Sequence, residues 1–265
     1  MQSMETWRTA IVDADPTHIW VRGYDVSALM QHSSFASVVF LLLQGRLPKP
    51  REERLLDAIL ISVADHGSGA PSCAASRLVA SGNRQSLSAA IAAGVLAIGD
   101  NHGGAGEACM EVIATVVGKA NTQGVTIAEA AIQEVEESKA AGRRLPGFGH
   151  RLHTTDPRVR VLFTMAEETG VAKEGVAAVV AIEDALRERV KPLPMNIDGA
   201  LAAVLFDLGF APNAGKLIFI VGRVAGLAAE VAEEHAREKA MRIKIPVTYD
   251  GVPPRALDAD ELAPK

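Results

Sequence analysis

The stretch LPGFGHRLHTTDPR, residues 145–158, decides how the rest of the sequence is interpreted. Gly147 and Gly149 flank one aromatic residue, and glycine lets the backbone take φ > 0 and approach a ligand without a Cβ clash. Asp156 followed by Pro157 is typical of a helix N-cap and first helical position. The histidines and the arginine between Gly149 and Asp156 form a basic loop that faces a helix N-terminus, which suits an anionic ligand. The spacing alone also allows a solvated loop between two helices.

Length and composition indicate a soluble, mainly helical protein. The chain has 265 residues, 48% hydrophobic and 22% charged, which suits one large domain or two smaller ones. Aromatic residues make up only 4% while alanine is abundant, which favours closely packed helices. The net charge of −5 gives no global basic field for nucleic acid. Cys73 and Cys109 form no motif, and no signal segment or membrane span is expected, so we predict a cytoplasmic protein without nucleic-acid or membrane partners.

Helix signals follow one another along the chain after a short N-terminal β-hairpin. Residues 7–12 and 18–22 are predicted to be the strands of this hairpin. Capping residues and apolar spacing then predict helices over 35–45, 55–63, 71–82, 86–99, 105–117, 126–142, 157–169, 173–190, 197–208 and 213–238. The predicted fold class is therefore all-α.

Two further stretches occur in order around the glycine loop, namely NHGGAGEA at 101–108 and Asn-Ile-Asp at 196–198. Together with the Pro-Gly-Phe-Gly-His…Asp-Pro-Arg pattern, they resemble the citrate synthase family, which includes citryl-CoA lyase and the citryl-CoA-cleaving part of ATP-citrate lyase. The resemblance implies a citrate-synthase-like fold with a large helical domain from 1–103 and 208–265. A smaller helical domain would be inserted at 104–207, with the active site in the cleft and a homodimer or higher homo-oligomer as the assembly.

Three residues are candidates for catalysis. The resemblance implies that His102 stabilises the enol of the acetyl thioester, that His150 exchanges a proton with the substrate hydroxyl, and that Asp198 moves the α-proton. A helix N-terminus would keep His102 neutral and make it a hydrogen-bond donor, although a simple helix-capping role is open. The positive charge of Arg151 disfavours protonation of His150. Asp198 is either only an N-cap or a carboxylate whose pKa an apolar cleft raises, and the two are compatible.

Four residues are candidates for holding the substrate carboxylates, namely His66, Arg158, Arg223 and Arg242. A planar guanidinium pairs bidentately with a carboxylate, which suits Arg158 and Arg223. Arg223 interrupts an apolar helix, so it needs either a structural Asp or Glu or an anionic substrate. His66 could instead interact with the dipole of the preceding helix. Arg242 is a loose match to a family arginine that reaches the site across the dimer interface.

The glycine loop is also the candidate site for coenzyme A. The resemblance assigns this role to Leu145, Pro146, Gly147, Phe148, Gly149 and Arg151. His153 matches no catalytic position and is interpreted as a ligand-facing or surface residue. His66, His102 and His150 do not show the spacing of zinc ligands in the sequence, so we expect no zinc site. We therefore expect no metal or redox cofactor, with a coenzyme A thioester as substrate.

The predicted function is that of a citryl-CoA lyase, which cleaves citryl-CoA to acetyl-CoA and oxaloacetate. The short chain and the Ile-Gly-Asp-Asn sequence at 98–101 resemble the lyases more than the synthases. The first alternative is a citrate or methylcitrate synthase, which also hydrolyses the thioester. The second is a non-catalytic regulator that binds coenzyme A or a dicarboxylate.

Overall fold

The computed structural model describes residues 6–149 and 156–256, and it begins with a small antiparallel sheet. Its strands β1 (Val12–Ala14), β2 (Ile19–Val21) and β3 (Tyr24–Asp25) pair in the order β1-β2-β3. The predicted hairpin is confirmed, but its first strand begins later than the predicted range 7–12 and a third strand is added.

Eleven α-helices follow the sheet in the described part of the chain. They are α1 (Val26–His32), α2 (Phe35–Gln44), α3 (Pro50–Val63), α4 (Pro71–Gly82), α5 (Leu87–Leu96), α6 (Ala105–Gln123), α7 (Ile127–Ala140), α8 (Pro157–Glu168), α9 (Glu174–Arg189), α10 (Ile197–Asp207) and α11 (Ala214–Arg237). This series confirms the all-α fold class.

Local capping chemistry fixes most of these helix ends. The Ser34 hydroxyl accepts a hydrogen bond from the backbone in the first turn of α2, and Gly45 ends that helix in the left-handed conformation. Thr126 and Glu129 form the predicted capping box at α7. Asp156 caps α8 ahead of a proline at the first helical position, as the sequence indicated.

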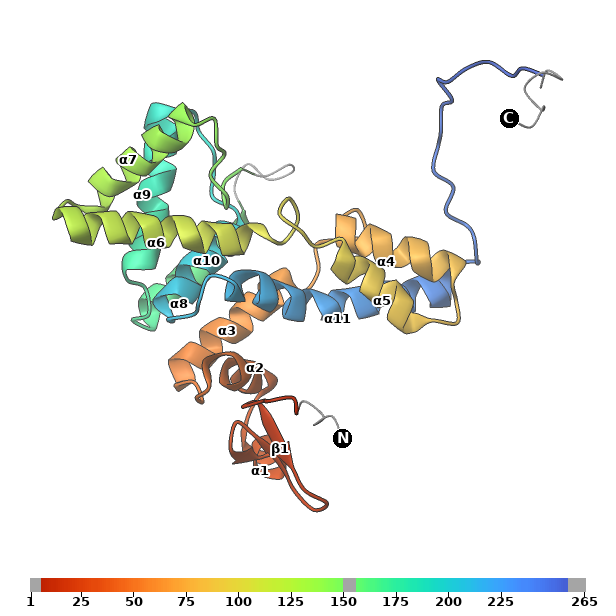
Figure 1. Cartoon of the computed structure of the whole chain (residues 1–265), viewed down its shortest axis with the longest axis horizontal. Helices are drawn as coiled ribbons and strands as arrows, with labels where there is room; N and C mark the ends of the chain where they lie inside the picture. Colours follow the sequence, from red (N-terminus) through yellow and green to blue (C-terminus); the bar gives the residue numbers. More distant parts are fainter. Residues whose placement is uncertain (1–5, 150–155, 257–265) are drawn as a thin grey trace, which may run out of the picture.

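The long helix α11 packs against α3, α4, α5, α6 and α10, whereas α7 and α9 pack against each other and against α6 (Figure 1). Helices α4 and α5 pack against the C-terminal half of α11, and α3 and α6 pack near its N-terminal half. One apolar cluster joins residues of α2, α3 and α6 to α11, and two smaller clusters lie between α4, α5 and α11. The predicted domain boundaries at 104 and 207 fall at the start of α6 and the end of α10, and the division into two domains stays a prediction.

After α11 the chain continues without helix or strand as far as residue 256 and leads away from the helices (Figure 1). None of the helices described has both the length and the apolar character needed to span a bilayer.

Candidate active site

A cavity of about 460 Å³ gathers five of the residues that the sequence analysis proposed for catalysis or substrate binding. These residues are His66, His102, Arg158, Asp198 and Arg223. They come from the loop after α3, the turn before α6, the first turns of α8 and α10, and the middle of α11. The fold therefore brings together side chains that are far apart in the sequence.

The ring of His102 is held by Ser72 in the first turn of α4. The Ser72 backbone N–H donates to His102 Nε2 over 3.2 Å, and the Ser72 hydroxyl oxygen lies 2.8 Å from the same nitrogen. A ring nitrogen that accepts an N–H carries no proton, so this contact favours the tautomer that is protonated on Nδ1. His102 can therefore donate a hydrogen bond through Nδ1. The capping alternative is wrong because the N-cap of α6 is Gly104.

Asp198 has a carboxyl oxygen that is buried without a hydrogen bond. The cap of α10 is Asn196, whose Oδ1 accepts from the Asp198 N–H over 2.9 Å, so Asp198 is not the N-cap. Asp198 Oδ1 has no hydrogen-bond partner among the described residues. Burial raises the pKa of Asp198 from 3.8 to about 6, although the nearby charges of Arg158 and Arg223 lower it. The carboxyl group can therefore give up or take a proton near neutral pH.

Arg223 is a buried cation without an ion pair in the described part of the structure. It is 2% exposed, and its Nε donates to the Val63 carbonyl over 2.8 Å while Nη1 donates to Ser72 Oγ over 3.0 Å. Its guanidinium also lies 5.0 Å from the centre of the Phe219 ring. The structural Asp or Glu that the sequence left open is absent from these contacts. A buried guanidinium facing a cavity is therefore suited to an anionic ligand.

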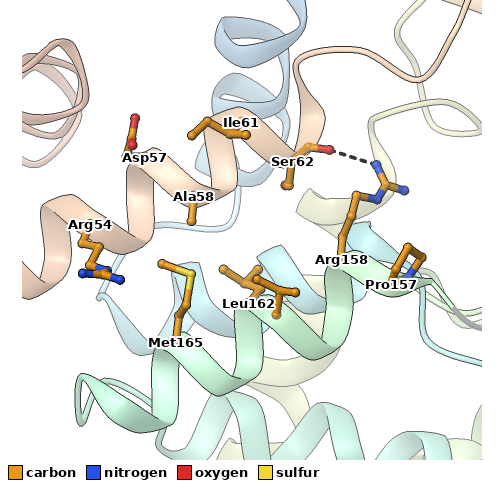
Figure 2. A pocket seen from close by; sticks show the side chains of 10 residues that line it. Arg54, Asp57, Ala58, Ile61, Ser62, Pro157, Arg158, Leu162 and Met165 are labelled. Atoms are coloured by element: carbon orange, nitrogen blue, oxygen red, sulfur yellow. Dashed lines mark hydrogen bonds between the residues drawn. The ribbon is translucent and has the colours of Figure 1, made fainter.

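Arg158 is shared between the cavity and a buried ion pair. Its Nε and Nη2 donate to the two carboxylate oxygens of Asp156 over 2.9 and 2.7 Å, and its Nη1 donates to the Ser62 carbonyl over 2.9 Å. A guanidinium has five N–H groups, so two remain for a ligand. Figure 2 shows Arg158 at one end of a second, largely apolar cavity of about 650 Å³ between α3 and α8, with the hydrogen bond to Ser62 dashed.

The glycine loop pairs with the segment that leads into α10. The Asn196 N–H donates to the Gly147 carbonyl over 3.0 Å, and the Gly149 N–H donates to the Pro194 carbonyl over 2.7 Å. A Cβ on Gly147, whose φ is +88°, would lie 2.8 Å from the Gly199 Cα. Gly147 therefore allows the loop to approach α10, and its predicted role toward a ligand stays a prediction. Gly149 lines the cavity.

A third cavity, of about 300 Å³, lies beside the start of the glycine loop. Leu145 and Phe148 contribute apolar side chains to it. Its basic lining residues are Lys139, Arg143, Arg144 and Lys191. An apolar floor with several cations nearby suits a ligand that combines a flat ring with phosphates.

Besides residues 145–148 of the glycine loop, four residues that the sequence analysis singled out are not placed in the first cavity. His150, Arg151 and His153 lie outside the described residues. Arg242 lies beyond α11, where its Nε donates to Glu234 Oε1 over 2.9 Å. Arg242 was expected to reach the active site of a partner subunit. A single chain does not test this role, which stays a prediction.

Sequence reasoning missed Ser72 and Phe219. Phe219 lines the cavity and meets the His102 ring edge to face at a centroid distance of 6.2 Å. The one available signal was its position one helical turn before Arg223. Ser72 follows a proline at a helix start and carries no signal of its own, because its contacts are to residues distant in sequence.

Among the described residues, one group could offer three metal ligands, namely Asp65, Cys73 and Glu230. Its members already have partners, since Cys73 Sγ contacts Asp65 Oδ2 at 3.5 Å and Glu230 pairs with Arg77. Burial raises the pKa of the Cys73 thiol, which disfavours the thiolate that a metal needs. His66 and His102 belong to no such group within the described ranges.

Comparison with known proteins places this geometry in a family. Residues 48–244 match the family model described as the C-terminal domain of citrate synthase. The chain belongs to the citrate synthase family. It is 31% identical over 217 residues to the putative citrate synthase 2 of Mycobacterium tuberculosis strain H37Rv, covering 79% of this chain and 54% of that protein. The chain thus spans about half the length of the curated family members it matches.

Solved structures of the family agree with the fold. Citryl-CoA lyase from Hydrogenobacter thermophilus superimposes with a TM-score of 0.87 at 36% identity, covering 97% of this chain and 99% of that one. ATP citrate lyase from Methanothrix soehngenii, solved with citrate and coenzyme A, gives a TM-score of 0.76 at 20% identity, covering 100% of this chain and 44% of that one. The latter likeness shows the shared fold alone.

Proposed function

We propose that this member of the citrate synthase family cleaves citryl-CoA to acetyl-CoA and oxaloacetate. The observation that carries the proposal is the Asp198 carboxyl group, which is buried, without a hydrogen bond on Oδ1, and able to hold a proton near neutral pH. It shares one cavity with His102 and with two arginines. This set supplies an acid for carbon, a donor for an enolate oxygen and cations for carboxylates.

In the cleavage direction, the hydroxyl proton of the citryl group passes to His150, as the family resemblance implies. The C–C bond then breaks, and its electron pair moves into the enolate of acetyl-CoA while oxaloacetate forms. His102 donates its Nδ1 proton as a hydrogen bond to the enolate oxygen, and protonated Asp198 delivers a proton to carbon to complete the methyl group. Arg223 and the two remaining N–H groups of Arg158 hold carboxylates during the reaction.

The lyase reaction is supported by the likeness to the Hydrogenobacter lyase over almost the whole of both chains. A citrate synthase activity is the second candidate, because the curated relatives bear that name. A synthase carries out the same C–C chemistry in reverse and then hydrolyses the citryl thioester.

The coenzyme A moiety is proposed to extend from the active cavity along the glycine loop. The third cavity, with Leu145 and Phe148 as its floor, would take the adenine, and its four basic side chains would face the phosphates. Arg151 would join them, as the resemblance implies. No metal or redox cofactor takes part in this scheme.

We further propose a cytoplasmic homodimer with the two-domain division at 104 and 207. Apolar side chains exposed on α4 and α5 support self-association, namely Leu78, Leu87 and Leu96. Light scattering after size-exclusion chromatography tests the assembly, with a mass of twice 27.9 kDa as the expected result. A monomer at micromolar concentration would contradict it.

Product analysis tests the proposed reaction. Citryl-CoA should give acetyl-CoA and oxaloacetate in equal amounts, with no free citrate. Acetyl-CoA with oxaloacetate should release little free coenzyme A. Sustained release of citrate and coenzyme A would make the protein a synthase, and binding of coenzyme A without either reaction would make it a regulator.

A further inference from the structure

The first turn of α11 carries a lysine where a helix favours an anion. Lys216 is the third residue of α11, and Asn213 at the N-cap forms no side-chain cap hydrogen bond. A cation at this end is opposed by the helix dipole. The position of Lys216 therefore calls for compensating contacts.

Two carboxylates on either side of His102 provide these contacts. Lys216 Nζ lies 3.1 Å from Glu107 Oε2, in the first turn of α6, and 3.5 Å from Asp100 Oδ1, in the turn before His102. The Asp100 side chain is 93% exposed, so solvent weakens that pair, whereas Glu107 is 32% exposed. The hydrogen bond to Glu107 raises the pKa of Lys216.

The turn that bears His102 lies directly on α11. The Gly99 carbonyl accepts from the N–H groups of His102 and Gly104 over 2.8 and 3.0 Å, which closes the turn. A Cβ on Gly104 would lie 2.9 Å from Lys216 Cε, and one on Gly103 would lie 2.2 Å from the Phe219 ring. Lys216 and Phe219 are three residues apart, so they share one face of α11.

We infer that Lys216 is a positioning residue for His102, because it ties both flanks of the turn to α11. The inference rests on the proposed function, in which the His102 ring meets the enolate oxygen. Ser72 contacts the ring, and Lys216 pairs with carboxylates on both sides of the turn, so the two sets of contacts together would position Nδ1. Small displacements of a reacting group cost up to about 10²-fold in rate.

The test is Lys216→Met, which keeps the apolar stem and removes the charge. We expect kcat for citryl-CoA cleavage to fall by about 10-fold with KM within about twofold, because the turn moves while the carboxylate-binding arginines stay in place. Lys216→Arg should restore most of kcat. The matched control is Lys119→Met on α6, whose ammonium also bridges two carboxylates, those of Glu134 and Glu137 at 2.8 Å each.

Unchanged kcat in Lys216→Met, or an equal loss in the Lys119→Met control, would overturn the inference. A second readout separates its failure from failure of the proposed function. In protein labelled with ¹³C-histidine, the His102 ring resonance should shift in Lys216→Met and not in Lys119→Met. An unshifted His102 resonance in Lys216→Met would contradict the positioning role, whatever the activity of the protein. Absence of citryl-CoA cleavage by the wild-type protein would contradict the proposed function alone.

Discussion

Replacing Asp198 by asparagine should remove activity and stabilise the protein as the pH rises. The folded protein raises the pKa of this carboxyl group from 3.8 to about 6, mainly through burial. The native state therefore holds the proton more tightly than the unfolded state does. The free energy of unfolding therefore decreases as the pH rises from 3.8 to about 6, and the decrease caused by Asp198 stays constant above that range. Asparagine does not ionise, so the variant escapes this decrease.

The size of the effect follows from the pKa. Each pKa unit corresponds to about 1.4 kcal/mol, so the shift costs the wild-type protein about 3 kcal/mol above about pH 6. Part of the gain is offset, because a buried amide without hydrogen bonds costs about 1–3 kcal/mol at every pH. The pH dependence isolates the ionisation. From about pH 4.5 to about pH 7.5, the stability of Asp198→Asn relative to wild type should increase by about 2 kcal/mol.

Urea unfolding of both proteins at these two pH values measures the difference, and turnover is measured on the same samples. We expect a loss of about 10²–10⁴ in kcat together with the pH-dependent gain in stability. A stability difference that is the same at both pH values would refute the buried, ionisable state of Asp198. Near-normal turnover would refute its role as the acid.

Three further substitutions probe the residues around Asp198. Arg223→Leu should leave the unliganded fold about as stable, because no ion pair is broken among the described residues. Its affinity for oxaloacetate should fall by about 100-fold or more, and calorimetry that finds an unchanged affinity would contradict this. Ser72→Ala should lower kcat by about 10-fold and the free energy of unfolding by about 1–3 kcal/mol, since the Ser72 hydroxyl links His102 to Arg223. Kinetics and urea unfolding measure the two effects, and an unchanged kcat would contradict the proposed link. Gly147→Ala should destabilise the protein by more than Gly149→Ala does. A Cβ at Gly147 would meet the backbone of α10 at 2.8 Å, whereas a Cβ at Gly149 would meet only a leucine side chain at 3.6 Å. Equal losses of stability in denaturant titrations would contradict this difference.

Helix positions were predictable because their determinants are local. Ser34 and Gly45 flank α2, and Thr126 and Glu129 lie at the start of α7, so the sequence alone carries the signal for these helix ends. The first strand was misplaced because its register depends on pairing with β2, which no local pattern specifies.

The candidate site was predictable as a set of residues and less so as a set of contacts. The family resemblance identified five residues that line one cavity. It did not predict that Arg158 shares its guanidinium with Asp156, or that Ser72 holds His102 from 30 positions away. Asn196 took the capping role that the sequence left open for Asp198, since its side chain reaches two backbone N–H groups. These contacts depend on how the helices pack.

The most direct test of the central claim is the cleavage of citryl-CoA in D₂O, with the products identified by mass spectrometry. We expect oxaloacetate and acetyl-CoA that carries one deuterium in its methyl group, delivered through Asp198. Free citrate with free coenzyme A, or acetyl-CoA without deuterium, would contradict it.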